Sequence, residues 1–119
     1  MIYLTTINQS LQMDLAAAVT TTELTIVISS KQQSPTRRES WKLEHGVSTG
    51  VTALNIASAP VSPGEIHMIE NVTIYNADSV AATVTINILD GATVRIMVKH
   101  ILNSGEILGY GDSLGWYVL

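Results

Sequence analysis

The chain lacks cysteine and phenylalanine altogether, and aromatic residues make up only 5% of its 119 positions. Without cysteine, disulfide bonds and thiolate chemistry are excluded. Charged residues are also scarce, at 13% against about a quarter in an average soluble domain. Apolar residues reach 46%, which argues against disorder and leaves little charge to keep a free monomer in solution. We therefore expect the chain to be buried in an oligomer or a larger assembly.

Further absences limit the expected partners. The N-terminus shows no basic segment followed by an apolar core, so we expect no signal peptide. No run of residues approaches the ~18 apolar positions that a membrane-spanning helix needs. The net charge of −4 gives no general basic footprint for nucleic acid. We therefore expect protein partners, with neither nucleic acid nor a membrane among them.

The clearest pattern in the chain lies between residues 72 and 102. Two sets of β-branched residues, spaced two apart, flank the pair Asp90-Gly91. The first set is Val84, Ile86 and Ile88, and the second is Val94, Ile96 and Val98. Residues two apart share one face of a strand, and Asp-Gly suits a type I′ turn. The pattern predicts a β-hairpin with one apolar face, which other strands must cover because a lone hairpin is marginal in water.

The rest of the chain also alternates with a period of two. Leu11, Met13 and Leu15 predict a half-buried strand, and the β-branched run 24–28 predicts a core strand. Residues 65–76 predict a long strand in which Ile66, Met68, Val72 and Ile74 share one face. Glu70 falls on that same face, so we expect a bulge, a strand end or a partner there.

Two polar stretches predict breaks between strands. Residues 31–40 are polar and contain Pro35, which is typical of an exposed loop, and residues 59–64 contain two prolines and Gly64. Short strands without a convincing helix predict an all-β protein. We expect one domain, residues 1–119, that forms an antiparallel two-sheet β-sandwich of about eight short strands, with a jelly roll or a small barrel as variants. Residues 1–10 form either an arm or an edge strand.

The residue types needed for catalysis or metal binding are present without the spacing that these functions require. His45, His67 and His100 form no close pair at ligand spacing, and no serine lies in a Gly-x-Ser-x-Gly elbow. The segment Gly109-Tyr110-Gly111 lacks the lysine and helix of a phosphate loop, so it predicts a tight turn. We therefore expect a protein that is not an enzyme, with no catalytic residues, no metal and no cofactor.

Basic and aromatic residues are the candidates for partner contact. Four of the six basic residues lie close together at Lys31, Arg37, Arg38 and Lys42. They either contact an acidic partner surface or form a solvated loop that balances nearby glutamates. The aromatic side chains serve either as packing and interface anchors or as a sugar-binding platform. The candidate interface residues are Lys31, Arg37, Arg38, Trp41, Trp116 and Tyr117.

Three stretches together resemble small virion proteins of tailed bacteriophages. They are residues 15–24, residues 72–80 with the following strand 83–86, and the ending Ser104-Gly105-Glu106 with Tyr110-Gly111-Asp112 and Gly115-Trp116. In these proteins a Tyr-Asn turn joins two strands, and a Gly-Glu turn precedes a closing strand that contains tryptophan. The usual proline before Gly-Glu is Ser104 here, although Pro63-Gly64-Glu65 keeps it.

The resemblance implies a structural protein of the virion, assembled in the host cytoplasm. Its role would be a capsid decoration (cement) protein that bridges capsid subunits, or alternatively a component of the neck, tail or a fibre. The resemblance also implies a homo-oligomer, with a trimer favoured, that contacts the major capsid protein or other virion proteins. A glycan-binding β-sandwich is a further alternative, based on the aromatic residues.

Overall fold

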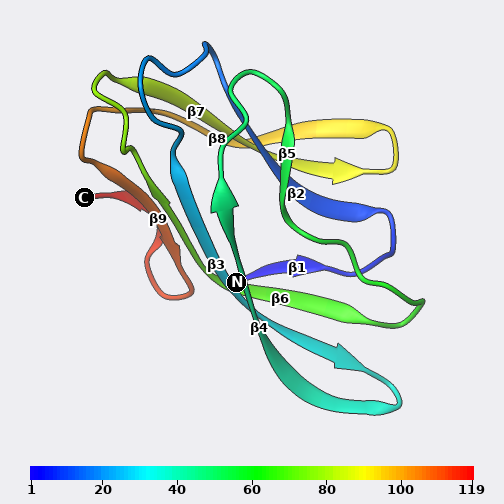
Figure 1. The fold of residues 1–119 in the computed structure, drawn as a ribbon. Helices are drawn as coiled ribbons and strands as arrows, with labels where there is room; N and C mark the ends of the chain where they lie inside the picture. The colour runs from blue at the N-terminus through cyan, green and yellow to red at the C-terminus, as the bar shows by residue number, and fades with distance from the viewer.

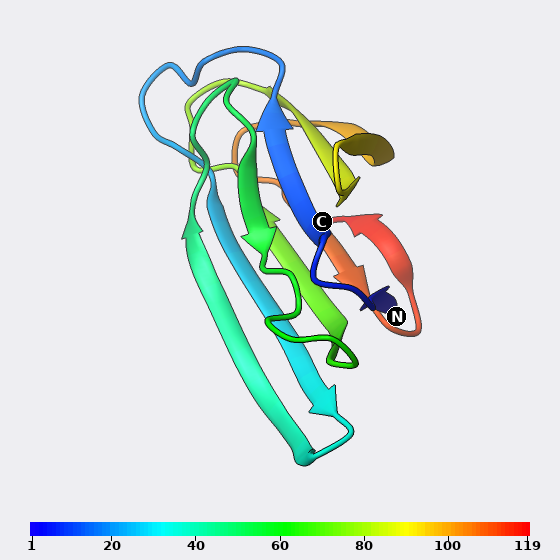
Figure 2. The ribbon, with the colours of Figure 1, turned by 90° about the vertical axis from the view of Figure 1, so that its right-hand side faces the viewer.

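The computed structural model describes the backbone of residues 1–119 and the side chains of residues 1–36 and 40–119. The backbone forms ten strands in two antiparallel sheets that pack against each other, and it contains no helix (Figures 1 and 2). The strands are β1 (Ile2–Leu4), β2 (Gln9–Leu15), β3 (Thr25–Ser34), β4 (Arg37–Val47), β5 (Leu54–Ala57), β6 (Ile66–Tyr75), β7 (Ala82–Asp90), β8 (Thr93–Leu102), β9 (Ile107–Gly111) and β10 (Gly115–Val118). The predicted two-sheet sandwich is confirmed, with ten strands where about eight were expected.

The strand order explains how distant segments become neighbours. The larger sheet runs β10-β9-β6-β3-β4, and β1 pairs with the part of β6 that β9 leaves open. The smaller sheet runs β5-β2-β7-β8. Hairpins join β3 to β4, β7 to β8 and β9 to β10, whereas the chain crosses between the sheets before and after β5. The edge strands β4 and β5 therefore lie on the same open side of the sandwich, as Figure 2 shows.

Alternation along the strands fills the core between the sheets. Leu11, Met13 and Leu15 of β2 are buried, as their spacing predicts. The same face of the larger sheet contributes aliphatic side chains from β1, β3, β6 and β9: Ile2, Leu4, Ile26, Ile28, Ile69, Val72, Ile74 and Leu108. Aliphatic residues dominate this interface, and Tyr110 is the one aromatic side chain of the buried hydrophobic cluster among the described residues. The core is therefore formed mainly by leucine, isoleucine and valine side chains from the facing sides of the two sheets.

The expected loop at residues 31–40 is instead the end of a long hairpin. β3 and β4 stay paired, through one register shift, as far as Ser34 and Arg37, and only Pro35 and Thr36 form the turn. The prediction was wrong because backbone hydrogen bonds hold a ladder together whatever the polarity of its side chains. The hairpin extends beyond the smaller sheet (Figure 2), so no second sheet faces its end and polar side chains are tolerated there.

The bulge expected near Glu70 is confirmed. Ser29 of β3 pairs with Asn71 and Ser30 pairs with Ile69, which leaves Glu70 as the extra residue of β6. The bulge reverses which side chains point inward, because each residue inserted in a strand moves the following ones to the other face. Ile69 is therefore fully buried while Met68 is not, and the expectation that Ile66 and Met68 share a face with Val72 and Ile74 is wrong.

The β7–β8 hairpin exists, but its details differ from the prediction. Asp90 pairs with Thr93, so the two turn residues are Gly91 and Ala92. Only Gly91 has a positive φ, at 61°, which fits a type II′ turn and not type I′. A register shift beside Met97 turns Val94 and Ile96 toward solvent, so the expected single apolar face of β8 is wrong.

Candidate interaction surface

Two of the candidate interface residues meet on the outer face of the larger sheet. Lys31 of β3 lies directly opposite Trp41 of β4, and its Nζ lies 4.5 Å from the centroid of the indole ring. The same Nζ lies 3.2 Å from the carboxylate of Glu70, the bulged residue of β6. The β3 ladder therefore places a cation within reach of both an aromatic ring and a carboxylate, and both interactions are favourable.

Exposed apolar side chains continue across the same face. Trp41 is 68% exposed and Leu43, two residues further along β4, is 65% exposed. Pairing between strands places further residues on this face, because their sequence neighbours point into the core. We call this set the outer apolar surface, and it consists of Tyr3, Val27, Trp41, Leu43, Val47 and Tyr75. It spans β1, β3, β4 and β6, so no local sequence pattern reveals it.

Trp116 and Tyr117 lie on β10, at the edge of the larger sheet opposite β4, and only Tyr117 shares the outer face with the outer apolar surface. Trp116 points toward the core side of β10 and packs against Tyr110, with ring centroids 5.1 Å apart and planes tilted by 50°. Tyr117 points the other way and lies over Gly109 of β9. Both are only partly exposed, so each side chain packs within the domain. The side chains of Arg37 and Arg38 lie outside the described residues.

A second exposed apolar strip follows the edge of the smaller sheet. β8 pairs only with β7, and its side chains Val94, Ile96 and Ile101 are exposed. Arg95 and Lys99 alternate with them along the same strand. Charged side chains on an edge strand are a common defence against strand addition, and β4 likewise carries Lys42 and Glu44 between its exposed apolar residues.

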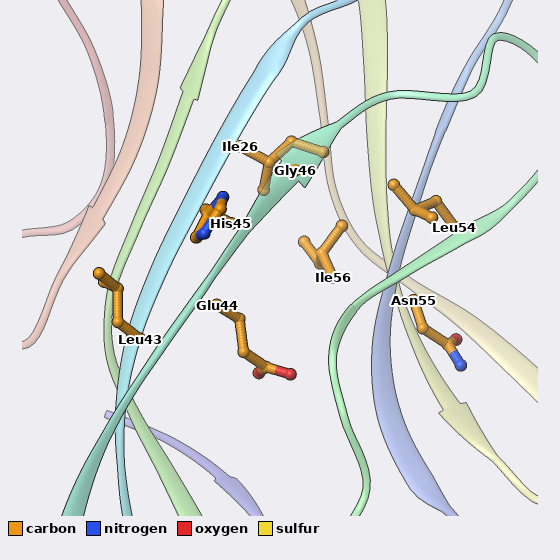
Figure 3. Close-up of a pocket in the computed structure, with 8 residues that line it drawn as sticks. All are labelled: Ile26, Leu43, Glu44, His45, Gly46, Leu54, Asn55 and Ile56. Carbon is orange, nitrogen blue, oxygen red and sulfur yellow. The ribbon is translucent and has the colours of Figure 1, made fainter.

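A groove opens between the edge strands β4 and β5. It has a volume of about 330 Å³ and is lined by Ile26, Leu43, Glu44, His45, Gly46, Leu54, Asn55 and Ile56. Figure 3 shows Ile56 and Leu54 on the side of β5, with the carboxylate of Glu44 extending into the gap from β4. The groove exists because the inner face of β4 carries Gly46 and polar side chains, which leave the edge of the core uncovered.

A polar network of hydrogen bonds lies beside the groove between β4 and β5. The ammonium Nζ of Lys42 donates to Ser58 Oγ at 2.7 Å and lies 3.5 Å from Glu44. The hydroxyl of Ser58 donates to Glu44 Oε1 at 2.9 Å. The network ties the edge of the larger sheet to the segment that follows β5, although Ser58 lies 14 residues from Glu44 in the chain. It joins the two layers where apolar contacts between them are few.

The strongest electrostatic stabilisation of a carboxylate lies at the other end of the sandwich. Asp78 is buried and accepts hydrogen bonds from the backbone N–H groups of Thr20 and Thr21, each at 2.8 Å, and from the Thr21 hydroxyl at 2.9 Å. The bond from the Thr20 N–H is the main reason why the pKa of the Asp78 carboxyl is well below its usual value. Asp78 therefore fastens the turn before β7 to the loop before β3.

Asn76 organises the same turn from the inside. Its side-chain amide donates to the carbonyl groups of Val80 and Leu102, each at 3.0 Å, and its Oδ1 accepts from the N–H of Asp78. Asn76 is fully buried, so all three bonds are shielded from water. The turn at residues 76–79 is thus a junction of loops that holds the end of the sandwich together.

No group of three or more His, Cys, Asp or Glu that could hold a metal ion occurs among the side chains that the structure describes. Within the same residues there is no helix long and apolar enough to cross a membrane. Comparisons with protein-family models, with curated proteins and with solved structures found no match to this chain.

Proposed function

We propose that this chain is a non-enzymatic structural protein of a bacteriophage particle, where it acts as a capsid decoration (cement) protein that bridges neighbouring capsid subunits. The resemblance of its turns to those of phage virion proteins supports the identity of the particle. The observation that supports a binding role is the outer apolar surface, where Trp41 and Leu43 lie side by side on an edge strand and are both about two-thirds exposed.

The size of such a contact explains why many copies would act together. At about 25 cal/mol per Å², burial of ~300 Å² of apolar area contributes about 7 kcal/mol. The loss of translational and rotational freedom on association costs a comparable amount, about 4–15 kcal/mol. A single contact of this size is weak, whereas an oligomer that touches several capsid subunits at once gains by multivalency.

The first experiment counts this chain in particles purified from cells that produce it. Quantitative mass spectrometry is expected to find it in a number comparable to that of the major capsid protein. A few copies per particle would favour the alternative of a neck, tail or fibre component. Particles that contain no copies would refute the proposal in both forms.

The second experiment asks whether the outer apolar surface makes the contact. Leu43→Glu places a charge at the centre of this surface and is expected to abolish binding to particles that lack the protein. Val61→Glu is the matched control, because Val61 is 84% exposed in the segment between β5 and β6, outside the strands that carry the surface. Equal binding by the two variants would show that another face is used.

A glycan-binding module is a second candidate, and the exposed ring of Trp41 is the observation that favours it. One face of this ring already lies near the Lys31 ammonium, so a sugar would have to stack on the other face. A glycan array on which the wild-type protein binds and Trp41→Ala does not would support this candidate. The absence of binding to any glycan would remove it.

A further inference from the structure

His67 differs from the other two histidines in its burial. It is only 2% exposed, whereas His45 and His100 lie on the surface. His67 is the second residue of β6, directly after the chain has crossed from the smaller sheet. Both of its ring nitrogens have a partner in this crossover: Nδ1 lies 2.9 Å from the carbonyl oxygen of Ser58, and Nε2 lies 2.6 Å from Oε1 of Glu65.

These two partners determine how many protons the ring carries. A carbonyl oxygen only accepts hydrogen bonds, so Nδ1 must be the donor to Ser58. A neutral imidazole has a single N–H, and its Nε2 would then direct a lone pair at the carboxylate of Glu65 at 2.6 Å. Such an approach of two acceptors is repulsive. The observed geometry therefore requires a second proton between His67 and Glu65.

The surroundings of Glu65 place that proton on the imidazole. The hydrogen bond with His67 is the main cause that lowers the pKa of the Glu65 carboxyl, and a hydroxyl hydrogen bond from Ser62, at 3.3 Å, acts in the same direction. Both interactions stabilise the carboxylate form. The result is a buried imidazolium–carboxylate pair, in which the two charges compensate each other.

No other charged group described near the ring disturbs this pair. The strands on either side of β6 place Leu4 of β1 and Gln32 of β3 opposite His67, and both are uncharged. From β4, Lys42 and Glu44 approach only through Ser58, and they form an ion pair with each other. Within the crossover, Glu65 is the charged partner and Ser58 and Ser62 are neutral.

We infer that a proton shared by His67 and Glu65 fastens the crossover between β5 and β6 to the larger sheet, and that the crossover loosens as the pH rises. When the ring loses its second proton, it keeps a single N–H, so either the carboxylate of Glu65 or the carbonyl oxygen of Ser58 then faces a nitrogen lone pair and that contact becomes repulsive. The contact is also lost in acid, when Glu65 becomes protonated. Because Ser58 is held by His67 on one side and by Lys42 and Glu44 on the other, the same change releases the polar network beside the β4–β5 groove. This inference does not depend on the proposed function.

The wild-type protein provides the first test, by NMR titration of the three imidazole rings. His45 and His100 are exposed and serve as internal references. We expect the ring-carbon shifts of His67 to mark the imidazolium form while those of the two exposed rings mark the neutral form. If the three rings change together along the titration, the inference is wrong.

The second test removes the need for the proton without removing the hydrogen bond. In Glu65→Gln the side-chain amide donates to Nε2 of a neutral ring, so the crossover should stay fastened at all pH values between about 6 and 9. In the wild type, protection of the Ser58 and Glu65 amides from hydrogen exchange, corrected for the intrinsic rate, should fall by about tenfold over this range. Glu106→Gln is the control and should behave as the wild type. The same decline in Glu65→Gln and in the wild type would overturn the inference.

Discussion

Gly109 offers the sharpest test of the packing in the larger sheet. It lies within β9, directly opposite Tyr117 of β10, and the phenol ring lies over it. A Cβ atom on Gly109 would meet Cζ of Tyr117 at 2.4 Å, Cε2 at 2.6 Å and Oη at 2.7 Å. Contacts below 3.0 Å essentially do not occur for real Cβ atoms, so one of the two residues must move. The φ angle of Gly109 is not positive, so the tyrosine ring is the only feature that demands glycine there.

The expected cost of Gly109→Ala is the difference between two effects. Overpacking a closed contact costs about 1–3 kcal/mol. Replacing a strand glycine by alanine returns about 0.5–1 kcal/mol of conformational entropy. A contact of 2.4 Å is severe, so the upper half of the overpacking range applies and the net destabilisation is about 1–2 kcal/mol. An unfolding entropy of about 2.1 cal/mol/K per residue makes each kcal/mol worth about 4 °C for 119 residues, so Tm should fall by about 4–8 °C.

Thermal unfolding followed by circular dichroism and calorimetry measures this shift. Gly111→Ala is the matched control on the same strand, because its Cβ would meet Leu114 and Tyr117 only at 3.9 Å. This control should keep or slightly raise Tm. In a Tyr117→Ala background the cost of Gly109→Ala should disappear, which a double-mutant cycle measures directly. If Gly109→Ala behaves as Gly111→Ala does, or if its cost persists without the tyrosine ring, the assigned contact is wrong.

Three further predictions concern the turns. Gly91→Val forces a β-branched residue into a φ of 61° and should lower the free energy of unfolding by about 1–3 kcal/mol in urea titrations; an unchanged midpoint would contradict the turn assignment. Asn76→Ala removes the hydrogen-bond donor of the carbonyl groups of Val80 and Leu102, and should cost about 3 kcal/mol of unfolding free energy or prevent folding. Asn76→Asp should be no better, because a carboxylate cannot donate a hydrogen bond to these carbonyl groups. The lowered pKa of Asp78 adds stability that is fully present above the ordinary carboxyl pKa and is lost as the pH falls below about 4. Asp78→Asn should therefore weaken the acid dependence of the urea midpoint. An identical acid dependence in both proteins would refute this.

Position-by-position alternation is the part of this fold that short-range patterns predict well. The spacing of Leu11, Met13 and Leu15 is enough to place them on one buried face, because the side chains of any strand alternate. The same reasoning gave a bulge at Glu70 as one of three alternatives, since a charge on an apolar face has to be accommodated. It could not foresee that the bulge would bury Ile69 in place of Met68, because that depends on where β3 loses its register.

The prediction failed for polar segments whose strands are held by backbone pairing and not by burial of side chains. Residues 31–40 contain no apolar alternation, yet the backbone of β3 and β4 pairs through most of them. The position of Pro35 in the turn was the available signal, since proline cannot donate in a ladder. In β8 the opposite error arose, because Val94 and Ile96 have the spacing of a core face but point to solvent.

The sequence by itself determined that this chain is all-β and built from short strands, since strand propensity, turn residues and the period of two are all local properties of the polypeptide. Only the tertiary structure decided which polar groups become partners. Asp78 finds Thr20 and Thr21 across more than 50 residues of chain, and His67 finds Ser58 across a crossover between sheets. The outer apolar surface is likewise assembled from four strands. Such groupings depend on strand order, and strand order is set by the packing of the whole core, which no short stretch of sequence contains.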